Sequence, residues 1–243
     1  MAPADITSGR KNSGYIRLTY EVDGGEVLKV CNIGQTKTPM TKEPRYRVVP
    51  RTKGNEDYAV KKGVKPDGKI PMPTIFVSAA RMWPIGESSK VEVTSSILAP
   101  DDADFIREFH NEIIPGEVTD GIARELDVSL SGGRVLRTQH PRYQYDASTI
   151  SLGQGALASI ATALASFRRL KRELKQDYPG GILVVDEIEA GLHPRAQESL
   201  AKALLREAKK LNLQVIVTTH SIVFLKQIYD VSQKKQSIDG IVY

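Results

Sequence analysis

The segment Gly180–Glu187 constrains the fold of this chain more than any other stretch. Two glycines precede four apolar residues, Ile182 to Val185, and two carboxylates follow them. A short apolar run bounded by turn residues is typical of a strand buried on both faces of a parallel sheet. The sequence therefore predicts such a strand, with Asp186 and Glu187 at its carboxyl end, where open α/β sheets bind ligands.

Two adjacent acids are costly in a dry interior, so a charged partner is expected beside them. A magnesium ion that carries a nucleotide phosphate is the natural candidate. The alternative is a strand that ends in solvent with two surface acids, because carboxylates flank many strands. This segment alone leaves both interpretations open.

The residues that follow predict a βαβ unit. Apolar residues recur at helical spacing across residues 195–212, and a second buried strand, Leu213 to Val217, leads into Thr218-Thr219-His220-Ser221. A strand, a helix and a strand form a right-handed parallel unit. Both strands would then deliver their polar ends, Asp186–Glu187 and His220–Ser221, to the same edge of the sheet.

Composition limits the class of protein. The chain has 243 residues, of which 40% are hydrophobic and 26% charged, which fits one large globular domain or two small ones. A single cysteine, Cys31, excludes an internal disulfide and suits a reducing cytoplasm. No apolar run approaches the length of a membrane span, and residues 1–11 lack the apolar core of a signal peptide. We therefore expect a cytoplasmic protein with no membrane partner.

The positive charge is concentrated in residues 35–69, which contain ten Lys or Arg and four acids, whereas the whole chain carries +5. Such a segment could contact nucleic acid phosphates. The alternative is a solvated loop.

The first half of the chain predicts several short elements. Tyr15–Val22 and Glu26–Ile33 flank the turn residues Asp23-Gly24-Gly25, which predicts a β-hairpin. Residues 35–72 are rich in Pro, Gly and Lys and predict an irregular insertion. Thr74–Ser78 is a candidate strand.

A helix is predicted from Asp101 to Ile114, with Asp101 or Asp102 as its cap. Its inward side chains would be Phe105, Ile106, Phe109 and Ile113. His110 would pack or lie at the surface of this helix, and Pro115-Gly116 would end it.

Residues 117–150 predict mixed short elements, with strands near Arg134–Thr138 and Arg142–Tyr145 and with His140 in a loop. Ser151-Leu152-Gly153-Gln154-Gly155 then opens a long helix. Its start offers backbone N–H groups, a hydroxyl and glycines, which together can bind an anion. The alternative is an ordinary serine cap.

Four stretches in order resemble the ATP-binding-cassette/SMC branch of the P-loop ATPases. Ser151–Gly155 resembles the signature motif, and Ile182–Glu187 resembles Walker B. Gly191–Pro194 resembles the D-loop, and Val215–Ser221 resembles the switch-histidine segment. The sequence of residues 186–194, together with that of residues 217–221, looks most like the AAA-core/overcoming-lysogenisation type of ATPase, which is common in bacterial anti-phage defence. Residues 73–87 also look like a segment that those proteins carry.

The resemblance implies a P-loop NTPase-like α/β fold, with a parallel sheet, flanking helices and an N-terminal antiparallel β part, incomplete at its N-terminus. We expect a single ABC-ATPase head-like domain over residues 1–243. Its expected parts are a β-hairpin (1–34), a basic irregular insertion (35–72), a mixed α/β part (73–150) and a motif-bearing core (151–243).

The resemblance also implies roles for residues. Asp186 would hold Mg²⁺ through water, Glu187 would orient and deprotonate the attacking water, and His220 would sense the γ-phosphate of ATP. The N-terminal residues of the long helix would contact the ATP of an opposing protomer: Ser151, Gly153, Gln154 and Gly155. The partners implied are a second copy or another chain at the signature face, and an effector or nuclease.

The family also needs a phosphate-binding loop, G-x-x-x-x-G-K-[ST]. The near-match Gly63–Ile70 is rejected, because Ile70 replaces the hydroxyl and Pro71 and Pro73 prevent a helix. We therefore expect Walker A upstream in a longer gene or in another chain. The segment Leu130-Ser131-Gly132-Gly133-Arg134 imitates the signature motif. Because β-prone residues follow it, it predicts a hairpin turn instead.

Three functions remain. The first is hydrolysis of ATP to ADP and phosphate by a head dimer, in bacterial defence or DNA-linked machinery. The second is a catalytically silent head that acts as an interaction module, which the absence of Walker A favours. The third is a nucleic-acid-binding protein that uses residues 35–69.

Overall fold

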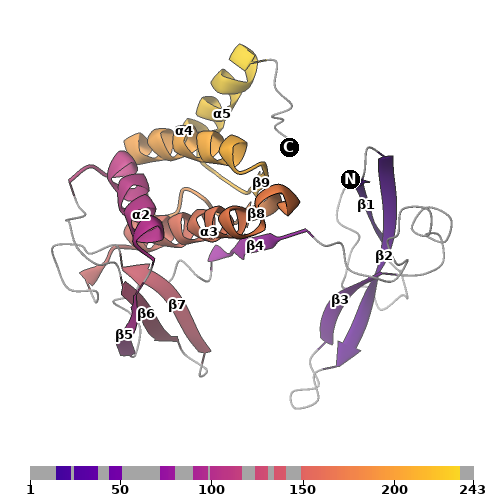
Figure 1. Ribbon diagram of the computed structural model, residues 1–243, viewed down its shortest axis with the longest axis horizontal. Helices are drawn as coiled ribbons and strands as arrows, with labels where there is room; N and C mark the ends of the chain where they lie inside the picture. Colours follow the sequence, from indigo (N-terminus) through magenta and orange to yellow (C-terminus); the bar gives the residue numbers. More distant parts are fainter. Residues whose placement is uncertain are drawn as a thin grey trace. The chain divides into compact units, whose positions relative to one another are not determined.

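The chain divides into two compact units, Met1–Pro71 and Met72–Tyr243. The boundary lies beside the predicted division between residues 35–72 and 73–150. The computed structural model (Figure 1) describes nine segments of the chain, residues 15–22, 25–37, 44–50, 72–79, 90–97, 99–116, 124–130, 134–140 and 149–235.

The first unit contains a three-stranded antiparallel sheet in the order β1 (Tyr15–Val22), β2 (Gly25–Lys37) and β3 (Pro44–Pro50). Val22 lies opposite Gly25 in the register, which confirms the predicted hairpin. The end of β2 and all of β3 fall within residues 35–72, so the prediction of an irregular insertion is wrong there. The abundant Pro and Lys hid a run, Tyr46 to Val49, whose β-branched and aromatic side chains favour a strand.

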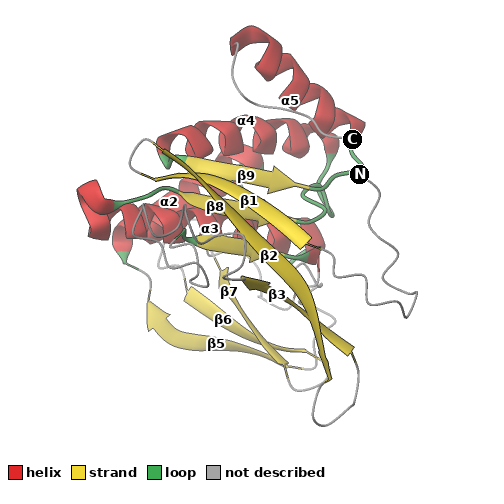
Figure 2. Cartoon of the chain, turned by 90° about the vertical axis from the view of Figure 1, so that its right-hand side faces the viewer, coloured by secondary structure: helices red, strands yellow, loops and turns green. Residues whose placement is uncertain are grey.

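The second unit is built around a parallel sheet in the order β4 (Thr74–Val77), β8 (Gly181–Val185) and β9 (Leu213–Val217). Both neighbouring pairs are parallel, and β8 lies in the middle of the sheet. Figure 2 shows β9 and β8 beneath helix α4. The predicted α/β class and all three predicted strands are confirmed.

Within the described residues, four α-helices accompany this sheet, and a short 3-10 turn, η4 (Lys175–Asp177), follows the second of them. They are α2 (Pro100–Ile113), α3 (Leu152–Leu174), α4 (Pro194–Lys210) and α5 (Ile222–Lys235). A Cβ on Gly181 would lie 2.4 Å from the Phe167 ring, so this glycine lets α3 pack directly on β8. Within the described residues, no helix has both the length and the apolar character that crossing a bilayer requires.

The parallel sheet is fully buried on one face only. Leu183 and Val185 are 0% exposed in a core shared with α3 and α4, whereas Ile182 and Val184 are half-buried. Phe76 and Ile216 flank Val184 on that second face and are 50% and 48% exposed. The prediction of burial on both faces is therefore wrong for the second face, because α3 and α4 pack against the first.

A second, antiparallel sheet in this unit has the order β5 (Lys90–Ile97), β6 (Arg124–Leu130) and β7 (Arg134–His140). Leu130 pairs with Arg134, which confirms the predicted hairpin turn. The loop predicted for His140 is wrong, because its pairing with Arg124 extends the ladder. The strand predicted near 142–145 lies outside the described residues.

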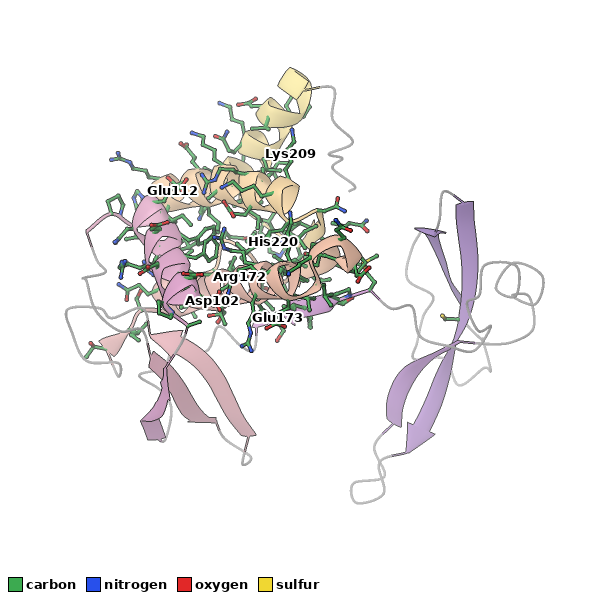
Figure 3. The ribbon with its side chains drawn as sticks, viewed as in Figure 1. Asp102, Glu112, Arg172, Glu173, Lys209 and His220 are labelled. Carbon is green, nitrogen blue, oxygen red and sulfur yellow. The ribbon has the colours of Figure 1, made fainter. Side chains whose placement is uncertain are left out.

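Helix α2 begins differently from the prediction. Its N-cap is Ala99, Pro100 takes the first helical position, and no side chain caps it. The cap predicted at Asp101 or Asp102 is therefore wrong. Asp102 instead bonds Arg172 of α3 at 2.6 Å, and the two side chains are labelled in Figure 3.

The predicted inward face of α2 is confirmed, since Phe105, Ile106, Phe109 and Ile113 are all buried. His110 is also 0% exposed, and burial lowers the pKa of its imidazole to about 4. His110 is therefore a neutral, packed side chain near pH 7.

A buried carboxylate connects α3 and α4. Glu207 is 2% exposed, and its oxygens lie 2.8 Å from Lys210, 3.1 Å from Arg206 and 3.6 Å from Arg168. Arg206 also holds Glu112 of α2 through two bonds, of 2.6 and 2.7 Å. This cluster fixes α2, α3 and α4 relative to one another.

Candidate functional site

Strands β8 and β9 end side by side. Val185 pairs with Val217 in a parallel register, and the pairing continues as Thr218 N–H donates to the Val185 carbonyl at 3.0 Å. Ile188 N–H in turn donates to the Thr218 carbonyl at 3.2 Å. The acidic pair and the histidine segment therefore share one edge of the sheet, as the sequence predicts.

Asp186 is fixed at this edge by two neighbouring strands. Its N–H donates to the Val77 carbonyl at the end of β4, 2.9 Å away, and its Oδ1 accepts the Thr218 hydroxyl at 2.6 Å. The second oxygen, Oδ2, has no protein partner among the described residues.

This arrangement fits a magnesium ion held through water. Mg²⁺ commonly uses one or two carboxylates and completes its shell with water and phosphate. Across the described segments, no group of three or more His, Cys, Asp or Glu side chains could hold a metal by itself. Asp186 can therefore contribute one carboxylate to a magnesium–phosphate complex.

Glu187 has an unusual backbone. Its φ is 50°, the left-handed region, which costs a non-glycine residue about 1–2 kcal/mol. Its N–H donates to Thr218 Oγ1 at 2.9 Å, and its side chain is exposed. Backbone strain of this kind concentrates at functional sites.

One hydroxyl holds both acids, since Thr218 Oγ1 donates to Asp186 and accepts from Glu187. Thr218 was not among the site residues predicted from the sequence. The available signal was its position directly after β9, one residue beyond the Val185–Val217 pair.

A second carboxylate holds the histidine segment. Glu189 Oε2 accepts the Thr219 hydroxyl at 2.6 Å, and Oε1 accepts the His220 N–H at 2.6 Å. The His220 side chain is exposed (labelled in Figure 3). Glu189 and Thr219 were also missed, although Thr219 directly precedes His220 and Glu189 lies two residues after Glu187.

Ser221 is bound from the other side. Its hydroxyl donates to Gln197 Oε1, and Gln197 Nε2 donates to the Leu192 carbonyl at 2.7 Å. Gln197 is buried in the first turns of α4. The segment that carries His220 is thus held at both ends.

The tip of α3 forms a capping box. Ser151 Oγ accepts the Gln154 N–H at 3.3 Å, and Gln154 Oε1 accepts the Ser151 N–H at 2.8 Å. Gln154 is buried, and Ser151 is exposed. The serine-cap interpretation is confirmed, and the box occupies polar groups of both side chains.

The tip also touches the turn after β8. A Cβ on Gly153 would lie 2.3 Å from the Gly191 carbonyl oxygen, and Gly191 itself has a φ of 68°. Only glycine at both positions permits this backbone contact. Residues 151–154 therefore lie against the turn that follows Glu187.

A pocket of about 670 Å³ opens between the C-terminal end of α2 and the N-terminal ends of α3 and α4. Its lining includes Ser151, Gly153, Gln154 and His193, whereas Asp186, Glu187 and His220 do not line it. His193 is exposed and caps α4, its Nδ1 accepting the Arg195 N–H at 3.3 Å. Gly155 is half-buried, one residue beyond the part of the tip that lines the pocket. The predicted residues thus form two groups, one at the sheet edge and one at the helix tips.

Some predictions lie outside the described residues. These are the rejected loop Gly63–Ile70, the side chains of the basic segment 35–69, and most of the family-like segment 73–87.

The sequence and the fold were compared with known proteins. A family model described as "AAA domain, putative AbiEii toxin, Type IV TA system" matches residues 83–226, which is more than half of the chain. No curated protein matches the sequence.

Among solved structures, the chain is similar to an SMC head domain from Thermotoga maritima, with 18% identity over 88% of this chain and 67% of that one, at a TM-score of 0.43. An SMC head bound to the C-winged helix domain of ScpA gives 18% identity, the same coverage and a TM-score of 0.44. A Smc head from Pyrococcus furiosus gives 18% identity over 52% of this chain and 29% of that one, at 0.32.

The family match spans α2, α3, β8, α4 and β9, and so includes both the sheet edge and the helix tips. The chain therefore belongs to the AAA-domain family described as putative AbiEii toxin of a Type IV TA system.

Proposed function

We propose that this chain is the part of an ATPase head that positions the attacking water and senses the γ-phosphate of ATP. The observation that carries the proposal is the shared edge where Thr218 fixes Asp186 and Glu187 while Glu189 fixes His220. Acids and a histidine held together at the carboxyl ends of parallel strands suit phosphoryl transfer, which depends on positioning and charge neutralisation.

Each residue has a separate task in this proposal. Asp186 would hold Mg²⁺ through water, and the bound ion would supply positive charge that neutralises the phosphates. Glu187 orients a water molecule and takes its proton as the oxygen attacks the γ-phosphorus, which releases ADP and phosphate. His220 donates to a γ-phosphate oxygen and so distinguishes ATP from ADP.

The tip of α3 would act on the nucleotide of an opposing protomer. The N-terminal end of this 23-residue helix carries partial positive charge and unpaired N–H groups, which favour phosphate. Ser151, Gly153, Gln154 and Gly155 would contribute this contact. The capping box uses Ser151 Oγ only as an acceptor, so the exposed hydroxyl can still donate its hydrogen to a phosphate oxygen.

Nucleotide binding would also require a phosphate-binding loop. No acceptable G-x-x-x-x-G-K-[ST] sequence was identified, so we propose that another segment or another polypeptide supplies it. We further propose one cytoplasmic head-like domain that functions as a homodimer or with a partner chain, in bacterial defence or DNA-linked machinery. An effector or nuclease partner and nucleic acid at residues 35–69 belong to the same proposal.

The test is phosphate release from Mg-ATP by the 243-residue chain, alone and joined to the in-frame segment encoded upstream of it. Hydrolysis by the extended protein should fall at least about 100-fold in Glu187→Gln, because general-base catalysis contributes that much. Glu198→Gln, the same change at an exposed position of α4, is the matched control. Turnover that persists in Glu187→Gln contradicts the role of Glu187.

A catalytically silent interaction module is the second candidate. The observation that favours it is the capping box, because it engages one side-chain oxygen of Ser151 and one of Gln154 within α3. Calorimetry with Mg-ATP separates the two candidates. No binding by either the chain or its extended form supports the silent module, and tight binding argues against it.

A further inference from the structure

We propose that Glu189 is a positioning residue, whose carboxylate sets where His220 stands and connects that position to the tip of α3. The proposal rests on the proposed ATPase function and adds to it a residue that neither touches phosphate nor transfers a proton. Glu189 lies two residues after Glu187, in the turn that joins β8 to α4.

Both carboxylate oxygens of Glu189 accept hydrogen bonds from one short segment. Oε2 accepts the Thr219 hydroxyl and Oε1 accepts the His220 N–H, each at 2.6 Å. Hydrogen bonds to an ionised carboxylate are short and about twice as strong as neutral ones. Because the second bond is made to the backbone of His220 itself, it fixes the point from which the imidazole extends.

This engagement separates Glu189 from the other two acids. Asp186 keeps one oxygen that meets no partner in the described part of the chain, and Glu187 has an exposed carboxylate. Glu189 is half-buried, with one donor on each oxygen. It is therefore arranged to hold protein groups, whereas its neighbours are arranged to meet water and Mg²⁺.

The same turn reaches the tip of α3. Leu192 N–H donates to the Glu189 carbonyl at 3.0 Å, which closes a tight turn around Gly191. The Gly191 carbonyl is the group that a Cβ on Gly153 would meet at 2.3 Å. A displacement of α3 by an opposing protomer would therefore press on the turn that carries Glu189.

Gln197 provides a second connection between the turn and the histidine segment. It accepts the Ser221 hydroxyl and donates to the Leu192 carbonyl. With Glu189 bound to residues 219 and 220 and Gln197 bound to residue 221, the segment and the turn move together. Contact at the helix tip and contact of His220 with phosphate would thus be coupled.

The first experiment needs no nucleotide. Hydrogen exchange of the His220 amide, measured by NMR on the full 243-residue chain, is compared between wild type, Glu189→Gln and the control Glu198→Gln. Glutamine offers one acceptor oxygen in place of two, so exchange should be about tenfold faster or more in Glu189→Gln and unchanged in the control. Unchanged exchange in Glu189→Gln overturns the proposal.

A second pair of variants covers the case in which Glu189→Gln does not fold. Thr219→Val removes the hydroxyl that Glu189 accepts, and Thr219→Ser keeps it. Exchange at His220 should rise severalfold in the valine variant and return to the wild-type rate in the serine variant. Equal rates in both variants overturn the proposal.

The activity readout uses the extended protein that hydrolyses ATP. Glu189→Gln should lower kcat about tenfold or more with little change in KM, because the variant misplaces His220 and leaves the rest of the site intact. An unchanged kcat overturns the positioning role even if exchange has changed. Absence of hydrolysis in the wild type would contradict the proposed function and leave the exchange result to decide the connection between Glu189 and His220.

Discussion

Thr218 donates its hydroxyl to Asp186 Oδ1 over 2.6 Å, although the two residues are 32 positions apart in the chain. The same oxygen accepts the Glu187 N–H at 2.9 Å. One side chain directly after β9 therefore sets the orientation of the Asp186 carboxylate, directly after β8, and holds the backbone of its strained neighbour Glu187. The geometry of Asp186 and Glu187 therefore depends on the pairing of β8 with β9.

Replacement of Thr218 should disturb both acids at once. Thr218→Val keeps the shape and removes the hydroxyl, so Glu187 N–H loses its acceptor and Asp186 loses its donor. We expect a stability loss of about 1–2 kcal/mol in urea unfolding, and slower hydrolysis in the extended protein. Thr218→Ser retains the hydroxyl and should behave like wild type. Equal behaviour of the valine and serine variants would contradict the role of the hydroxyl.

Two glycines at the tip of α3 should respond in opposite directions to alanine. Gly153→Ala places a Cβ 2.3 Å from the Gly191 carbonyl oxygen and should destabilise the fold by about 1–3 kcal/mol. Gly155→Ala meets nothing within 4 Å and should stabilise the helix by about 0.5–1 kcal/mol. Thermal unfolding of both variants measures the difference. A Gly153→Ala protein as stable as wild type would mean that the tip does not pack on the turn.

The buried carboxylate of Glu207 should matter far more than an exposed one. Glu207→Gln removes the negative charge that faces Arg168, Arg206 and Lys210, so we expect a loss of about 1.5–3 kcal/mol in urea unfolding. Glu173→Gln is the matched control, because Glu173 forms only an exposed ion pair with Arg169. The control should lose less than about 1 kcal/mol. Similar losses in the two variants would show that the cluster contributes no more than a surface pair.

Stability should fall in mild acid because of His110. Burial lowers the pKa of this imidazole from 6.5 to about 4, so between these values the unfolded chain binds a proton that the folded chain excludes. The free energy of unfolding is therefore highest above pH 6.5. It falls by about 3 kcal/mol in total as the pH falls toward 4. Urea unfolding at a series of pH values measures this slope.

The matched variant for this prediction is His110→Gln, in which the slope between pH 6.5 and 4.5 should flatten. Glu112 does not obscure the comparison. Its bond from Arg206 lowers the pKa of its carboxyl below 4.5, so its contribution is present above 4.5 and is lost only at lower pH. A slope that survives in His110→Gln would assign the acid sensitivity to another group.

The sequence by itself determined the elements that carry the site. The apolar runs before Asp186 and before Thr218 are short, continuous and separated by one amphipathic helix, and right-handed parallel connection then brings their carboxyl ends to one edge. The order of motifs also indicated the family that the match to residues 83–226 shows. These inferences depend on local periodicity and chain order, which the sequence contains directly.

Only the tertiary structure decided which side chains meet. Asp102 was predicted as a helix cap and instead binds Arg172, 70 positions away. Thr218 accepts the N–H of the predicted residue Glu187, and Glu189 accepts the N–H of the predicted residue His220. The open face of the sheet and the contact of Gly153 with Gly191 were equally absent from any local pattern. The physical reason is that a hydrogen bond or a backbone contact forms within about 3 Å, and only the packed chain brings distant segments that close.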